Sequence, residues 1–386
     1  MFFIALKSTV SNWIASLNPD NRSRLIALDL LRGLFLVIIF ADHLAYQPSL
    51  FFQLATNNSA LLASAAEGFF VISGILVGYI YGPKIIKQPL AVAKKLWKRA
   101  GTLYLLTIVF TLLYTLWAYL LPDGYPRAVP YQGSAMEILF KTITLQYQFG
   151  WADFLGRYAV FMAVSPLVLW LIAKGYVWLV ALLSVLVWYF YAFTPILQFY
   201  TAWQLIFMFG IIIGFYLPSI EAAVKRIPQK IRQVSWWSIV TLGVGTYIVS
   251  VAWIVIIAPH VLSILWMPHE IIPYFDKNSL AKGRIAVGVL WFLTLYLLFR
   301  RYEKWISSAT KGSLLILGKA SLFVYCLQAF IIFSVDVFVP APENSPIILN
   351  TLVGVVGIWV VYIITKHRAS IKQWVQQMWR ALLHSK

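Results

Sequence analysis

The sequence predicts an all-α integral membrane protein of about ten transmembrane helices, with both termini in the cytoplasm. Three observations lead to this fold class. Of the 386 residues, 61% are apolar and 11% are charged, whereas an ordinary soluble domain has roughly 25% charged residues. Apolar stretches of about 20 residues, long enough to cross a bilayer, recur along the whole chain. Lysine and arginine gather in alternate intervals between these stretches.

Ten stretches of the chain have the length and composition of a span. They lie at 25–46, 61–82, 100–121, 153–173, 176–193, 199–217, 236–258, 283–299, 313–335 and 346–365. The boundary between the fifth and the sixth depends on a single break at Thr194-Pro195. The segment Ala135–Phe149 is too short and too polar to cross, so we expect a half-helix or an interfacial segment there.

Charge then orients the spans. The intervals on the side of the N-terminus hold 23 of the 31 lysines and arginines, and the opposite intervals hold six. Cytoplasmic loops carry the excess of basic residues, so we expect a single transmembrane domain over 1–386, with a cytoplasmic segment 1–24 and a cytoplasmic tail 366–386. The net charge of +18 comes from these clusters, which would face anionic lipid, and nucleic-acid binding is not predicted. The single cysteine, Cys326, excludes an internal disulfide.

The first predicted span carries four ionisable side chains, Asp29, Arg32, Asp42 and His43. A charge at the centre of a span costs about 2.5–3.5 kcal/mol on insertion, so such residues usually have partners or a function. In a helix, Arg32 and His43 point within about 20° of each other, and Asp29 has the i,i+3 spacing of an ion pair with Arg32. This polar stripe, about 16 Å long, has two interpretations: a structural ion pair with a histidine in an outer cap, or a site in which His43 beside Asp42 acts as a general base.

The second predicted span places Glu67 on the same face as Gly74 and Gly78. Glycines four residues apart permit the close approach of a neighbouring helix. A carboxylate on such a face should meet a partner across the contact. We expect this partner to be His43 or Arg32 of the first span.

Polar and aromatic residues also gather in the segments predicted to lie outside. The candidates for contact with an acceptor are Gln146, Trp151, Asp153, Asp276, Lys277, Asn278 and Arg284. Solvated loops account for many such residues, but a polar and aromatic rim also suits a carbohydrate. His260 and His269 lack metal-ligand spacing to other ligands, so no metal site is predicted.

Several stretches of the chain together form a recognisable pattern. They are Leu28-Asp29-Leu30-Leu31-Arg32-Gly33, Phe40-Ala41-Asp42-His43, Ala66-Glu67-Gly68-Phe69-Phe70-Val71-Ile72-Ser73-Gly74, Leu145-Gln146-Tyr147-Gln148 with Trp151-Ala152-Asp153, Ala202-Trp203-Gln204-Leu205, Phe275-Asp276-Lys277-Asn278-Ser279-Leu280 with Arg284, and Leu317-Gly318-Lys319-Ala320-Ser321-Leu322. This pattern resembles the OpgC family of bacterial membrane proteins, which is linked to succinylation of osmoregulated periplasmic glucans, and the resemblance covers most of the chain. Two positions depart from the family's pattern: Gln328 replaces a common histidine, and Arg157 replaces an apolar residue or proline.

The spacing from Arg32 to His43 is also similar to that in the wider membrane acyltransferase superfamily. The resemblance implies an O-acyltransferase that moves an acyl group, such as succinyl, from a cytoplasmic acyl-CoA to a hydroxyl of a periplasmic or extracellular glycan. In that superfamily the histidine of this motif is considered catalytic and the arginine functional. We expect Asp42 and Glu67 to assist His43, and Arg32 with Asp29 to meet the donor.

The expected partners are the lipid bilayer of a bacterial inner membrane, an acyl donor and a glycan acceptor, with acyl-CoA as a co-substrate and no bound cofactor. The sequence predicts no oligomeric state. A transporter or flippase for a glycan or an acyl compound is the alternative, because intramembrane charges also serve transport. The sequence has no evident inverted repeat, which argues against it. An inactive family member that scaffolds glucan synthesis is a third possibility.

Overall fold

The computed structural model describes most of the chain, and every regular element in the described part is helical. This confirms the predicted all-α membrane fold. The described residues are 24–44, 46–47, 49–50, 61–121, 128–191, 198–252, 272–339, 341–342 and 345–384.

The contacts divide the chain into two compact units, which are described separately. Unit 1 comprises Met1–Arg24, Leu62–Tyr247 and Pro259–Phe292, and unit 2 comprises Leu25–Leu61, Ile248–Ala258 and Leu293–Lys386. The prediction of a single domain over the whole chain stays a prediction.

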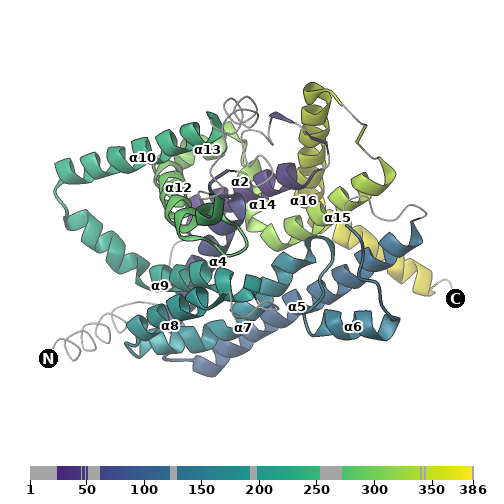
Figure 1. The fold of residues 1–386 in the computed structure, drawn as a ribbon, viewed down its shortest axis with the longest axis horizontal. Helices are drawn as coiled ribbons and strands as arrows, with labels where there is room; N and C mark the ends of the chain where they lie inside the picture. Colours follow the sequence, from purple (N-terminus) through teal and green to yellow (C-terminus); the bar gives the residue numbers. More distant parts are fainter. Residues whose placement is uncertain are drawn as a thin grey trace. The chain divides into compact units, whose positions relative to one another are not determined.

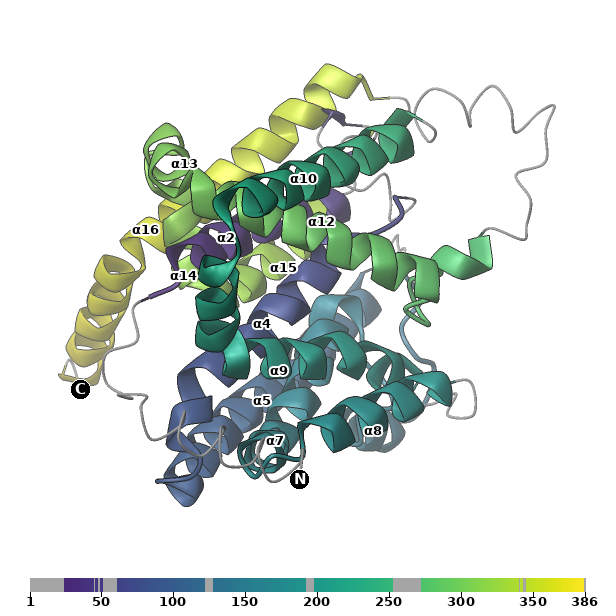
Figure 2. The ribbon, with the colours of Figure 1, turned by 90° about the vertical axis from the view of Figure 1, so that its left-hand side faces the viewer.

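Unit 1 contains the helices of the middle of the chain, between the first span and the C-terminal helices (Figure 1). They are α4 (Ala65–Tyr81), η1 (Gly82–Lys84), α5 (Pro89–Leu120), α6 (Ala135–Ile143), η2 (Gly150–Ala152), α7 (Asp153–Ala173), α8 (Val177–Tyr189), α9 (Gln198–Arg226), most of α10 (Gln229–Ala252), η6 (Ile272–Phe275) and the first part of α12 (Lys282–Arg301). Figure 2 shows α7, α8 and α9 packed side by side. Helix α6 has nine residues, which agrees with the short segment predicted before the fourth span.

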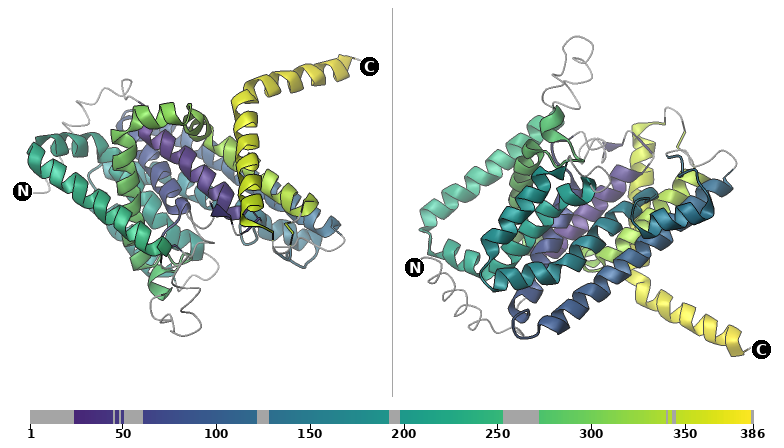
Figure 3. Two further views of the ribbon diagram at one scale, coloured as in Figure 1. Left: turned by 90° about the horizontal axis from the view of Figure 1, so that it is seen from above. Right: turned by 60° about the horizontal axis from the view of Figure 1, so that its bottom comes forward.

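Unit 2 contains the first span and the C-terminal helices. They are α2 (Ile26–His43), the ends of α10 and α12, α13 (Glu303–Ala309), α14 (Ser313–Lys319), α15 (Ser321–Phe338) and α16 (Ile347–His384). Figure 3 shows that α16 bends sharply before its C-terminal part, which continues in a different direction. With bounds of Ile347–His384, α16 is longer than the predicted span 346–365.

Eight helices in the described residues are long and apolar enough to cross a membrane. Of the ten predicted spans, two lie outside this group. Helix α8 has 13 residues, and α2 carries three Asp or Arg side chains among its 18 residues. The break predicted at Thr194-Pro195 lies outside the described residues.

The glycine face of α4 packs against α9 inside unit 1. A Cβ atom at Gly78 would overlap the carbonyl oxygen of Ile211, and one at Gly214 of α9 would overlap that of Ile75. The close approach predicted for the glycines is confirmed. The neighbouring helix is α9, however, and the expectation that this face meets the first span is wrong.

The ninth predicted span, 313–335, is broken into α14 and α15. The break lies at Ala320, whose φ of −106° and ψ of 23° are not helical. On the α14 side, a Cβ atom at Gly318 would overlap the carbonyl oxygen of Asp29, so α14 lies against the backbone of α2. This close contact and the break together bring the N-terminus of α15 to the polar stripe of α2.

Candidate functional site

The polar stripe on α2 begins with a buried ion pair. Asp29 lies in the first turn, where a helix favours negative charge, and its Oδ1 is 4.0 Å from Nη1 of Arg32. Arg32, which is 8% exposed, also donates from Nη2 to the hydroxyl of Ser321. The i,i+3 pair expected from the sequence is therefore present, and a third partner joins it from α15.

Ser321 is the first residue of α15, directly after the break at Ala320. The N-terminus of a helix presents backbone N–H groups and partial positive charge. The guanidinium of Arg32 and the N-terminus of α15 thus lie side by side in unit 2, and both favour a negatively charged group. Broken helices in membrane proteins use the same arrangement to meet anionic groups.

His43 is the last residue of α2 and lies at the other end of the stripe. Its Nδ1 is 2.7 Å from the carbonyl oxygen of Ile39. A carbonyl oxygen can only accept a hydrogen bond, so Nδ1 carries the proton, and in the neutral ring Nε2 is then the nitrogen without a hydrogen. The backbone of Ile39 thus fixes the tautomer that a general base needs, and the role of Asp42 stays a prediction.

Glu67 is buried in unit 1, where it makes two sets of contacts. Its Oε1 forms an ion pair with Nε of Arg284, and its Oε2 accepts a hydrogen bond of 3.1 Å from the backbone N–H of Ser64 and another from the Ser64 hydroxyl. The second set is a capping box that begins α4. The sequence pattern Ser64-x-x-Glu67 is the signal for this cap. The interpretation of Glu67 as a catalytic residue does not take this structural role into account.

Arg284, predicted to contact an acceptor, is 1% exposed. Besides Glu67, it donates from Nη1 to the carbonyl of Phe275 at 3.3 Å. These bonds join the N-terminal end of α12 to the N-terminal end of α4. The described contacts of Arg284 are those of a residue that holds two helices together.

Asp276 organises the turn before α12. Its Oδ2 accepts bonds of 2.8 Å and 2.6 Å from the backbone N–H and the hydroxyl of Ser279. Partial burial raises the pKa of Asp276, but the bonds from Ser279 and Asn278 and the nearby charge of Arg284 outweigh it, so its pKa is lowered. Lys277 and Asn278 belong to the same turn, which Trp188 of α8 holds through bonds of 3.1 Å to the carbonyls of residues 279 and 280.

The remaining acceptor-side candidates, Gln146, Trp151 and Asp153, lie at or near a polar pocket of unit 1. Gln146 and Asp153 line a pocket of about 550 Å³ together with residues of α6, α7 and α9. Trp151 is not part of its lining and packs edge-on against Tyr114. Of the seven predicted acceptor-side residues, two thus line this pocket, three form the turn at Asp276, and Trp151 and Arg284 belong to neither.

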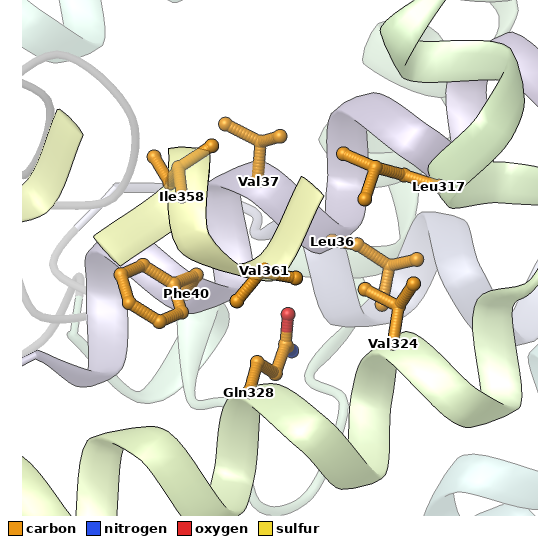
Figure 4. Close-up of a pocket in the computed structure, with 8 residues that line it drawn as sticks. All are labelled: Leu36, Val37, Phe40, Leu317, Val324, Gln328, Ile358 and Val361. Carbon is orange, nitrogen blue, oxygen red and sulfur yellow. The ribbon is translucent and has the colours of Figure 1, made fainter. Parts of the chain in front are cut away.

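Gln328, where the resemblance leads one to expect a histidine, is 2% exposed in unit 2. Figure 4 shows its amide pointing from α15 toward Val361 of α16. It lines a cavity of about 10 Å³ with seven apolar side chains of α2, α14, α15 and α16. Such a volume holds about one water molecule, so Gln328 sits in a space too small for a substrate.

Within the described ranges, no three His, Cys, Asp or Glu side chains are grouped as a metal ion would require. His260 and His269 lie outside those ranges.

Comparison with protein families shows what the chain is similar to. Residues 24–373 match the family described as OpgC protein. No curated protein matches the chain, and no solved structure matches it. The match extends over most of the chain and includes both ends of the polar stripe, the Glu67 cap and the polar pocket. The chain therefore belongs to the OpgC protein family.

Proposed function

We propose that this protein is a membrane O-acyltransferase that moves an acyl group, such as succinyl, from acyl-CoA to a glycan hydroxyl. Membership of the OpgC family suggests a glucan-modifying membrane acyltransferase. The observation that carries the proposal is the bond from His43 Nδ1 to the Ile39 carbonyl, because it places the proton of the neutral ring on Nδ1 and therefore makes Nε2 the basic nitrogen. His43 and Arg32 share a face of α2 about 16 Å apart, so one extended donor could meet both.

In the proposed reaction, Nε2 of His43 takes the proton of the acceptor hydroxyl as its oxygen attacks the thioester carbonyl. The tetrahedral intermediate then collapses, the carbon–sulfur bond breaks, and the thiolate leaves and receives the proton from the imidazolium. The products are an ester and free CoA. General-base catalysis of this kind contributes about 10²–10⁴-fold to the rate.

Arg32 and the N-terminus of α15 are proposed to hold the anionic part of the donor. The guanidinium presents several donors in a fixed geometry that suits phosphate or carboxylate oxygens. The pantetheine arm of CoA would cover the separation between Arg32 and His43. Glu67 carries no proton in this scheme, because its contacts with Ser64 and Arg284 account for its burial.

The test is the release of free thiol from acyl-CoA by the purified full-length protein, with a glycan as acceptor. His43→Ala should lower the rate at least about 100-fold. Gln47→Ala is the matched control, because Gln47 bonds the carbonyls of Ala41 and Leu44 at the same end of α2. If His43 were only a capping residue, both variants would have similar small effects, and a His43→Ala rate within about tenfold of the parent would remove the assignment.

A transporter remains the second candidate, and the break at Ala320 favours it, since transporters bind substrates at broken helices. The two functions differ in their products. Movement of a glycan or an acyl compound across vesicles without thiol release would support transport and exclude the acyltransferase. Steady thiol release that depends on the glycan would exclude transport as the only function.

The orientation and the location are also proposals. We infer a bacterial inner membrane with basic loops on the cytoplasmic side. In a Cys326→Ala background, a cysteine in place of Gln132 should react with an impermeant thiol reagent added to intact cells. Cysteines in place of Lys87 and Lys311 should react only after the cells are opened, and the opposite pattern would reverse the orientation.

A further inference from the structure

The polar pocket in unit 1 has the dimensions of a ligand site. Its volume of about 550 Å³ falls within the range of roughly 300–1,000 Å³ that small-molecule sites occupy. Its walls come from α6, the connection to η2, and the first turns of α7 and α9. Several elements thus converge on one space, lined by both polar and aromatic side chains.

One wall of the pocket contains a buried arginine in a fixed position. Arg157 is 9% exposed and forms an ion pair with Asp153 one turn earlier on α7. Its guanidinium lies 5.1 Å from the centre of the Phe199 ring and 5.3 Å from that of Trp203. Cation–π contacts and the ion pair together hold this charged pair at the pocket wall.

The connection before η2 supplies two amides. Leu145 has a φ of 58°, an unfavourable conformation for a residue other than glycine, and such strain is typical of functional sites. Gln148 donates to the hydroxyl of Tyr200 and, at 3.2 Å, to the carbonyl of Leu145. Gln146 is exposed, and no side-chain hydrogen bond holds its amide within the described residues. Its donor and acceptor are available to a ligand.

Aromatic rings form a further part of the lining. Tyr131 and Tyr147 lie with their ring centres 5.7 Å apart. The Tyr147 hydroxyl is bonded to Thr115 at 2.9 Å, so the position of this ring is fixed. The face of an aromatic ring is electron-rich and apolar. The C–H groups on one face of a pyranose ring pack favourably on such a surface.

Each of the two cations that line the pocket is paired with an anion. Lys141 pairs with Glu137 at 3.2 Å, and Arg157 pairs with Asp153. A hydrogen bond from Tyr131, together with Lys141, lowers the pKa of Glu137. Tyr131 and Glu137 likewise raise the pKa of Lys141, so both groups stay charged at neutral pH. Because each cation of the lining is paired, Arg157 with Asp153 of the lining and Lys141 with Glu137 outside it, the pocket favours an uncharged ligand with many hydroxyl groups over a free anion.

We propose that this pocket binds an uncharged pyranose unit of the glycan acceptor. The Asp153–Arg157 pair, Gln146 and Gln148 would bond its hydroxyls, and the tyrosine rings would cover one face. The inference rests on the proposed function, since it names the acceptor that this function requires. It concerns binding alone, and it can be tested without any acyl transfer.

The experiment is calorimetric titration of the full-length protein in nanodiscs with neutral glucose oligosaccharides, and separately with inorganic phosphate and succinate. We expect saturable binding of the oligosaccharides that neither anion displaces. Gln146→Ala should weaken binding about fivefold, the effect of one lost neutral hydrogen bond. Because the Gln146 amide has no partner within the described residues, this variant should keep its thermal stability.

A second pair of variants tests the wall formed by Gln148 and Tyr200. A Cβ atom at Gly156 would lie 2.9 Å from Gln148 Nε2 and 3.2 Å from the Tyr200 hydroxyl, so Gly156→Ala should push both into the pocket and weaken binding. The matched control is Gly101→Ala, since a Cβ atom there would meet nothing within 4 Å. Gln233→Ala, an exposed glutamine on α10, is the control for Gln146→Ala.

The outcomes separate the pocket from the proposed function. Oligosaccharide binding that both pocket variants weaken, without any acyl transfer, would support the pocket and remove the acyltransferase. Acyl transfer without measurable oligosaccharide binding would overturn the pocket and leave the acyltransferase standing. Binding that neither pocket variant changes, or displacement by phosphate or succinate, would also overturn the inference.

Discussion

We expect the buried ion pair between Glu67 and Arg284 to make a large contribution to the stability of unit 1. The variant Glu67→Gln removes the negative charge of this pair and keeps the shape of the side chain. Glutamine also satisfies a capping box, so the variant keeps the bonds to Ser64. It leaves Arg284, which is 1% exposed, as an uncompensated buried charge. Breaking such a pair by removing one partner costs about 3–5 kcal/mol, whereas Ser64→Ala should cost about 0.5–2 kcal/mol because it removes only part of the cap.

The free energy of unfolding in mixed detergent and SDS micelles measures both effects. The double variant Glu67→Gln with Arg284→Met should recover most of the loss, because a buried pair replaced as a whole is often close to neutral. Two results would refute this reasoning. One is a Glu67→Gln variant that loses no more free energy of unfolding than Ser64→Ala does. The other is a double variant whose loss of free energy of unfolding equals the sum of the losses in the two single variants, since residues in contact should show coupling.

Three further predictions follow from other contacts. Arg32→Ala should weaken acyl-CoA binding at least tenfold, a change that equilibrium binding would detect, and unchanged affinity would remove its proposed role in donor binding. Gly214→Ala should destabilise the protein by about 1–3 kcal/mol through overlap with the Ile75 carbonyl, and Gly101→Ala should not, as apparent melting temperatures would show. The pKa of Asp276 is lowered from 3.8, so its contribution to stability is present above that pH and is lost as the pH falls through the lower folded value. Asp276→Asn should therefore flatten the fall in melting temperature below about pH 4, and an unchanged profile would contradict this.

The helix period was sufficient to predict the local features of the site. The Asp29–Arg32 pair and the shared direction of Arg32 and His43 follow from 3.6 residues per turn, and the structure has the pair. The partner Ser321 is 289 residues away in the chain, and no local pattern indicates it. The break at Ala320 was equally hidden, because the sequence there contains no proline and the break accompanies close packing against α2.

Glu67 and Arg284 were both singled out from the sequence, but as parts of different sites. Each is unusual as a charged residue in or beside an apolar segment, and composition makes such residues easy to find. Their pairing spans 217 residues and depends on how α4 and α12 meet. For the pocket, Gln146 and Asp153 were predicted from polarity, while Tyr200 was not, because a tyrosine near the end of a span has the ordinary appearance of an interfacial residue.

The long-range partner of Arg32 also has a consequence for how the protein is made. Helix α2 is the first of the described helices to leave the ribosome, and it carries Asp29, Arg32 and Asp42. At about 5–20 residues per second, the 289 residues that separate Arg32 from Ser321 take roughly 15–60 s to synthesise. Until then the arginine lacks this partner, and each charge in a span raises the cost of insertion by about 2.5–3.5 kcal/mol. We expect α2 to enter the bilayer late, with the helices that follow it, so that a nascent chain ending before α15 holds the candidate catalytic helix only loosely in the membrane.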